Sequence, residues 1–221
     1  MRRLILTVAM AGLICLPVLA QFPFGGLRGG MDSNSMLSSK DVQKELKLSE
    51  DQIKTITSAR DEMTKAMRAA FQDMDRDAMR KAQEDMTKTL TKVREAFTPE
   101  QKKRFFQLEL QSAAKGTQAA IFKREDVQKV MKFTSEQKEK VSSALSELEK
   151  DVKEVFEDAQ GDREKFQAAM KKVQGLGKDT FDKITKSLSD EQKKAWKELQ
   201  GEEFKGEFRP AFGKGGKKKD F

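Results

Sequence analysis

An acidic stretch in the first half of the chain has the side-chain spacing of a calcium-binding loop. Its carboxylates are Asp73, Asp75, Asp77 and Glu84. They match acidic positions of an EF-hand loop, in which oxygen atoms surround the ion. However, Ala78 stands where the loop turn requires Gly, and Arg80 stands where an apolar residue usually packs. Acids that cap a helix explain the stretch better, so calcium is only a weak candidate and we expect no metal or cofactor.

A methionine series in the same region is the sharpest local feature of the sequence. It comprises Met63, Met67, Met74, Met79 and Met86. Because methionine is flexible and polarizable, a Met-rich face suits the binding of varied apolar segments. Core packing at helical spacing is nevertheless the favoured interpretation. Binding of Cu(I) by the thioethers of Met63 and Met67, one helical turn apart, is a weak alternative.

Several apolar residues are candidates for contact with a binding partner. They are Met63, Met67, Phe71, Met74, Phe105 and Phe106. Phe105 and Phe106, together with Phe122, either line a binding surface or close the core. Burial in the core is the favoured interpretation for these three aromatic residues.

Catalysis has no candidate residues in this sequence. The chain contains no histidine, and Cys15 is its one cysteine. A mechanism would therefore need paired carboxylates, a lysine or a Ser–Lys pair, and nothing in the sequence singles out such a pair. Zinc or nickel sensing is not expected either, because the usual nitrogen and sulfur ligands are missing. We do not expect an enzyme.

The helices that carry these residues are marked by a signature that occurs four times. Each copy has an apolar residue, then Ser or Thr, two residues that are mostly acidic, and Gln. The residues are Leu48, Ser49 and Gln52; Phe97, Thr98 and Gln101; Phe133, Thr134 and Gln137; and Leu188, Ser189 and Gln192. The hydroxyl caps a helix N-terminus, and the Gln three positions later returns a hydrogen bond to the backbone N–H of the cap. Each signature therefore predicts a helix start.

The first 20 residues have the pattern of a cleaved signal peptide. Arg2 and Arg3 precede an apolar run that is too short for a comfortable membrane span, and Ala20 suits cleavage. A lipid-modified Cys15 is less favoured, because Ile14 replaces the small residue that such a site needs. We therefore expect a periplasmic or secreted protein that is not a membrane span.

The spacing of the signatures indicates an internal duplication. Phe133 lies 85 positions after Leu48, and Leu188 lies 91 positions after Phe97. Apolar stripes at helical spacing and a charged fraction of 36% predict an all-α fold. We expect roughly six to seven helices in two hairpin units whose stripes pack against each other across the copies in one elongated domain. The expected segments are a signal peptide at 1–20, a flexible Gly/Ser-rich lead at 21–37, helical repeats at 38–122 and 123–200, and a basic disordered tail at 201–221.

The four signatures resemble the LTxxQ-motif family of bacterial periplasmic proteins, which includes the Spy- and CpxP-like proteins. The resemblance covers residues 41–200. It implies a curved helical dimer whose concave face, basic with apolar patches, holds unfolding proteins without ATP. The two copies within this chain would then supply what two subunits supply in the family, although a homodimer remains possible.

These considerations predict a chaperone-like protein whose partners are unfolded or partly folded proteins. The competing function is a structural or interaction module that holds a specific envelope protein. A metal-responsive sensor is a third and less favoured function. Nucleic acid is not expected as a partner: although the net charge is +8, basic and acidic residues are interleaved, as is typical of solvated helix faces. Phe204, Phe208 and Phe212 either form a short amphipathic segment or belong to the solvated tail.

Overall fold

The computed structural model describes residues 33–116, 118–158 and 163–208, and these residues form helices and connecting segments without any β-strand. The first helices are α1 (Ser33–Met36), α2 (Lys40–Glu45), α3 (Glu50–Gln72), α4 (Arg76–Glu95) and α5 (Pro99–Lys115). A 3₁₀ helix (Ala119–Lys123) is followed by α6 (Glu125–Val130), α7 (Ser135–Glu157), α8 (Arg163–Lys186) and α9 (Asp190–Gln200). The all-α prediction is confirmed. The described residues contain nine α-helices, more than expected, because α1, α2 and α6 are too short to show a helical period.

All four signatures begin a helix, as predicted. Ser49, Thr98, Thr134 and Ser189 are the N-caps of α3, α5, α7 and α9. In each case the hydroxyl accepts a hydrogen bond from the backbone N–H of the glutamine, and the glutamine side chain accepts one from the N–H of the cap. This reciprocal capping box satisfies two backbone donors that the helix itself leaves unpaired.

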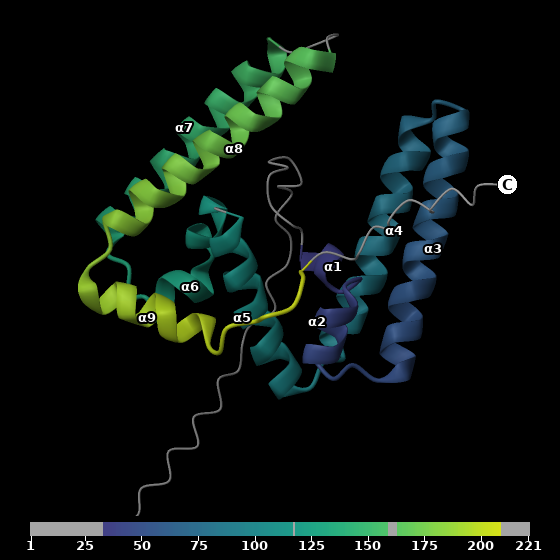
Figure 1. The fold of residues 1–221 in the computed structure, drawn as a ribbon, viewed down its shortest axis with the longest axis horizontal. Coiled ribbons are helices and arrows are strands. Elements are labelled where there is room, and N and C mark those ends of the chain that lie inside the picture. The colour runs from purple at the N-terminus through teal and green to yellow at the C-terminus, as the bar shows by residue number, and fades with distance from the viewer. Residues whose placement is uncertain (1–32, 117, 159–162, 209–221) are drawn as a thin grey trace, which may run out of the picture.

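The longest helices form two hairpins, which we call the first arm (α3 and α4) and the second arm (α7 and α8). Both extend from a base that contains α5, α6 and α9, and their far ends lie apart (Figure 1). In the first arm, the turn places Met74 at a φ of 54° and Asp75 as the N-cap of α4. The arms are therefore long, narrow elements with two helices each, and most of their length is surface.

The described residues form two separate apolar cores, each of which joins elements of the base to the helices of one arm. The first core includes Leu46, Ile56, Leu90, Phe97, Phe105 and Leu108. The second core includes Leu110, Phe122, Phe133, Val141, Phe181 and Leu188. Helix α5 contributes to both, because Phe105 and Leu108 face the first core while Leu110 and Ala113 face the second. The expectation that stripes pack across the copies is wrong for the arms: each long helix buries its stripe against its partner in the same hairpin.

The segments on either side of the expected repeats are more ordered than the sequence suggested. Met36 and Leu37, placed in the flexible lead, are buried in the first core at 1% and 0% exposure. Phe204 and Phe208, placed in the disordered tail, are buried in the same core. Both predictions are wrong at these positions, because these large apolar side chains are part of the first core. The signal peptide, most of the lead and the basic end of the tail lie outside the described residues.

Among the described residues, no helix combines the length and the apolarity that a membrane crossing requires.

Candidate functional site

The glutamines of the signatures meet in pairs at the root of each arm. The Nε2 of Gln101 donates to the carbonyl of Leu46 at 3.2 Å and lies 3.4 Å from the Oε1 of Gln52. In the second half, Gln137 and Gln192 exchange amide hydrogen bonds at 2.9 Å, and Gln192 also donates to the carbonyl of Met131 at 3.2 Å. The signatures are therefore contact points between helices as well as caps.

These contacts were missed by reasoning from each signature alone. A capping box uses only the carbonyl oxygen of the glutamine amide, so the NH₂ group still needs acceptors when it is buried. Gln192 is only 9% exposed. These NH₂ groups need acceptors outside their own capping box. That requirement was the signal from which the pairing of two signatures could have been predicted.

The turns that precede the two arms have the same geometry. Lys47 and Lys132, 85 positions apart, have positive φ angles of 49° and 52°. The following N–H groups of Leu48 and Phe133 donate to the carbonyls of Gln43 and Gln128. This left-handed turn ends the short helix and directs the chain into the arm.

The far end of the first arm carries the candidate residues that are free to contact a partner. Phe71 is 70% exposed and Met74 is 76% exposed. Met63 and Met67, on α3, are half-buried. A large apolar side chain that remains this exposed on a polar helix contributes little to folding, so it is available for binding.

The far end of the second arm has a similar aromatic pair that was not among the candidates. Phe166 is 51% exposed, and its ring lies 5.7 Å from the ring of the half-buried Phe156. Phe156 lies 85 positions after Phe71. The duplication was therefore the signal that could have identified it.

Two other candidates are not available to a partner. Phe105 is 5% exposed and packs edge to face with Phe97 at 5.7 Å. Phe106 is half-buried beneath the guanidinium of Arg124, which lies 4.9 Å from the ring centroid. The favoured assignment to the core is confirmed for Phe105, and Phe106 is partly buried against the second core.

Arg124 itself is held by two carboxylates. It forms ion pairs with Glu109 at 2.9 Å and Asp126 at 2.7 Å. Burial alone would lower the pKa of Arg124, but the hydrogen bonds to Asp126 and Glu109 raise it above its ordinary value. The cluster fixes α6 to α5 through ion pairs within the protein.

The acidic stretch considered for calcium is used within the protein. Asp75 accepts a hydrogen bond from the backbone N–H of Ala78, which confirms its capping role. Asp77 and Glu84 bind the guanidinium of Arg80 at 3.2 and 2.9 Å. Among the described residues, no group of three or more acidic side chains is placed to hold a metal ion.

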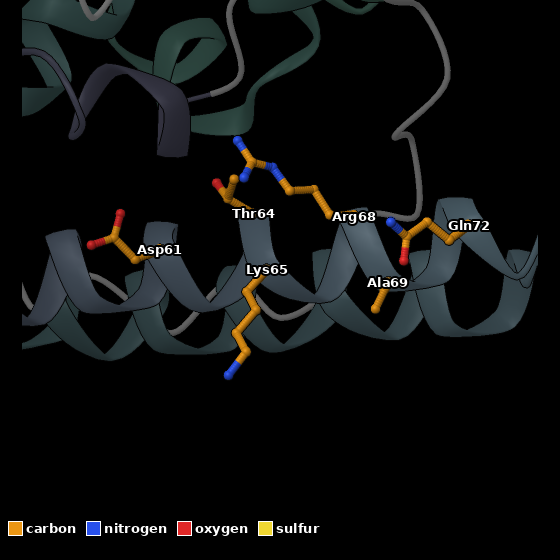
Figure 2. Close-up of a pocket in the computed structure, with 6 residues that line it drawn as sticks. All are labelled: Asp61, Thr64, Lys65, Arg68, Ala69 and Gln72. Atoms are coloured by element: carbon orange, nitrogen blue, oxygen red, sulfur yellow. The ribbon is translucent and has the colours of Figure 1, made fainter.

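A shallow hollow on α3 is lined by Asp61, Thr64, Lys65, Arg68, Ala69 and Gln72 (Figure 2). These side chains come from one helix, and Lys65 extends away from the side on which Thr64 and Arg68 lie. A hollow of this kind does not bring a nucleophile, a base and an oxyanion donor together. The exposed ends of the arms are therefore the best candidate for a functional surface.

No protein-family model, no curated protein and no solved structure matches the chain. The resemblance carried by the four signatures therefore stays a prediction. Function has to be argued from the surface of the arms.

Proposed function

We propose that this protein binds unfolding proteins without ATP, through the apolar ends of its two arms. The observation that carries the proposal is the exposure of Phe71, Met74 and Phe166 at the ends of long, otherwise polar hairpins. The predicted signal peptide places this activity outside the cytoplasm.

Exposed apolar side chains on separate arms suit a partner without fixed shape. Burial of one large apolar side chain contributes about 1.5–3 kcal/mol, so each arm alone would bind an apolar segment weakly. When one unfolded chain reaches both arms, the second contact is intramolecular and the affinity increases without any new type of contact. Methionine and phenylalanine also accept varied partner side chains, because their contacts are not directional.

The net charge of the chain favours acidic partners. Without Arg2 and Arg3 of the expected signal peptide the net charge is +6 (42 basic against 36 acidic residues). This charge raises the rate at which acidic unfolded segments approach, and salt weakens the attraction. Binding should therefore combine apolar contact at the arm ends with a salt-sensitive electrostatic component.

Suppression of aggregation tests the proposal. The wild-type protein should keep several unrelated denatured proteins in solution at near-stoichiometric ratios, less effectively in high salt. Replacing Phe71, Met74 and Phe166 together by Ser should reduce the protection at least about tenfold, because three apolar contacts of about 1.5–3 kcal/mol each are removed.

Val130→Ser is the matched control. Val130 is 51% exposed but lies on α6 in the base, away from the arm ends. This variant should protect as well as the wild type. If the wild-type protein protects none of the test proteins, the proposal is wrong, and a module that holds one specific envelope partner becomes the better account.

A further inference from the structure

Residues 201–208, which we call the strap, run from the end of α9 back to the first core. They follow a helix whose partly buried residues Trp196 and Leu199 pack on the second core. The strap itself has no helix or strand, yet it buries Phe204 and Phe208 in the first core, at 4% and 8% exposure. It is therefore a non-helical segment that joins the two cores.

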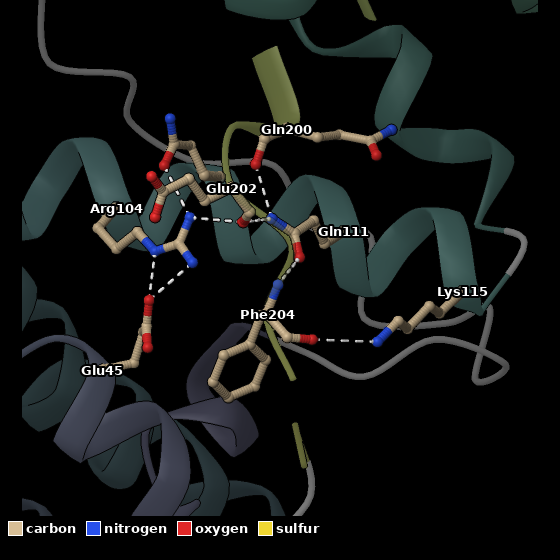
Figure 3. A network of polar contacts seen from close by, with 8 residues as sticks. Glu45, Arg104, Gln111, Lys115, Gln200, Glu202 and Phe204 are labelled. Carbon is tan, nitrogen blue, oxygen red and sulfur yellow. Dashed lines mark hydrogen bonds and ion pairs between the residues drawn. The ribbon is translucent and has the colours of Figure 1, made fainter. Parts of the chain in front are cut away.

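Gln111 on α5 recognises the backbone of the strap. Its Nε2 donates to the carbonyls of Gln200 and Glu202, both at 2.7 Å, and its Oε1 accepts from the N–H of Phe204 at 2.8 Å (Figure 3). Gln111 is only 5% exposed. One buried amide thus satisfies two backbone groups of the strap and the last carbonyl of α9, which fixes the register of the strap along α5.

Further polar contacts hold both ends of the strap. Arg104 donates to the carbonyl of Glu202 at 2.9 Å and forms an ion pair with Glu45 at 2.7 Å (Figure 3). At the other end, the backbone N–H of Glu207 donates to Asp41 at 2.9 Å, and its carbonyl accepts from Ser39 at 2.5 Å. The surface that receives the strap is therefore built from residues of α2, its N-cap and α5.

The two phenylalanines occupy apolar positions next to each other. Their ring centroids are 4.9 Å apart, and both belong to the first core with Met36 and Leu37. The ammonium of Lys115 lies 5.2 Å from the ring centroid of Phe208. Aromatic anchors in an apolar site, surrounded by backbone hydrogen bonds, are the arrangement by which proteins bind extended peptides.

Two glycines make the fit specific. Gly201 has a φ of 63°, and a Cβ there would lie 2.3 Å from the side chain of Gln107. A Cβ on Gly206 would lie 2.6 Å from the ring of Phe204 and 2.7 Å from the Cβ of Asp41. The site therefore selects small residues at these positions as well as aromatic residues beside them.

We infer that the surface formed by α1, α2 and α5 is a recognition site for an extended segment with two phenylalanines four positions apart. The strap is the segment that occupies this site within the chain, and it joins the second core to the first. The inference goes beyond the proposed function and does not depend on it, because the site lies in the base and its ligand is part of the chain.

Peptide binding in trans tests the inference. The probe is a fluorescein-labelled peptide with the sequence of residues 200–208, and the protein is the full chain carrying Phe204→Ser and Phe208→Ser. Fluorescence anisotropy should show binding to this variant at least about tenfold tighter than to the wild type, because the wild-type strap competes at an effective concentration of about 1 mM. A labelled peptide with Gly206→Ala should not bind, and Gln111→Ala added to the variant should abolish binding.

The inference is overturned if the peptide binds neither protein, if it binds both equally, or if the Gly206→Ala peptide binds as tightly as the unaltered one. Circular dichroism and the emission of Trp196 establish that the variant is folded. If that variant does not fold, Gly201→Ala in the full chain is used instead, because an alanine is strained at a φ of 63° and loosens the strap while both phenylalanines are kept. The same binding difference from the wild type is then expected.

Discussion

The glutamine at the end of a signature can cap a helix and also bind a second element, because its amide has both an oxygen acceptor and an NH₂ donor. The Oε1 of Gln192 accepts from the N–H of Ser189, while its Nε2 donates to the carbonyl of Met131 and to Gln137. A Glu at this position could cap the helix but could not donate. This requirement accounts for the glutamine at positions 101, 137 and 192, whose Nε2 groups all donate.

Replacing Gln192 by Ala should destabilise the protein by about 1–3 kcal/mol, because the change removes a cap bond and leaves buried polar groups without partners. Urea unfolding followed by circular dichroism measures the difference. Gln83→Ala, at an exposed position of α4, is the control and should change the free energy of unfolding by less than about 0.5 kcal/mol. Equal effects at the two positions would contradict the double role.

Two acids in the first turns of capped helices should make the protein sensitive to acid. Hydrogen bonds from its own backbone N–H and from the Thr98 hydroxyl lower the pKa of Glu100, and the corresponding bonds involving Ser189 lower the pKa of Glu191. A lowered pKa in the folded state means that these carboxylates stabilise the fold above their ordinary pKa of 4.5 and lose this effect as the pH falls through the lower folded value.

The thermal midpoint of the wild type should therefore fall between about pH 5 and about pH 3. The double variant Glu100→Gln, Glu191→Gln should lose less stability over the same interval, because those two side chains no longer titrate. Differential scanning calorimetry at both pH values makes the comparison. A variant that is as acid-sensitive as the wild type would show that other groups control the acid response.

At the scale of elements, the two arms differ in what their helices bury. The second arm buries Leu148, Val152 and Val155, whereas the positions 85 residues earlier are the half-buried Met63 and Met67 and the small Ala70. Half-buried methionines and a small alanine remove less apolar surface from water than buried leucine and valine side chains. The first arm should therefore open more readily than the second.

Hydrogen exchange should detect this difference within one molecule. Backbone amides around Met63 and Met67 should exchange at least about tenfold faster than those around Leu148 and Val152, a difference of about 1.4 kcal/mol in local stability. The second arm serves as the internal control, because its residues lie at matched positions of a hairpin of similar length. Slower exchange in the first arm would contradict the comparison.

Helix starts were predictable from the sequence because a capping box is a local signal: Thr98 and Gln101 lie three positions apart. The partner of each stripe was not predictable, because helical periodicity identifies an apolar face but not what covers it. For the same reason Phe71 and Phe105 look equivalent in sequence, although one is exposed and the other buried. The packing of the strap was not predictable. Phe204 lies in a Gly- and Lys-rich segment, and it contacts residues more than 90 positions away in the sequence.

At the scale of the whole molecule, α5 and the strap are the elements that join the two cores. Replacing Phe204 and Phe208 by Ser should lower the stability of the first core by at least about 3 kcal/mol. Trp196, the single tryptophan, packs on the second core and reports on it alone, whereas circular dichroism reports on all helices. In the wild type the two signals should change together. In the variant, loss of helix should precede the change in Trp196 emission.

Coincident transitions in that variant would show that the strap does not couple the cores. Phe166→Ser, at the exposed end of the second arm, is a control of the same chemistry and should leave the two signals coincident.

Site-specific cross-linking to an unfolded protein tests the central claim most directly. A photoreactive aromatic residue is placed at position 71, 166 or 130, and each protein is irradiated with a permanently unfolded polypeptide. Binding through the arm ends predicts cross-links from positions 71 and 166 that weaken in high salt, and few from position 130 in the base. Equal yields at the three positions, or a higher yield at position 130, would contradict binding through the arms.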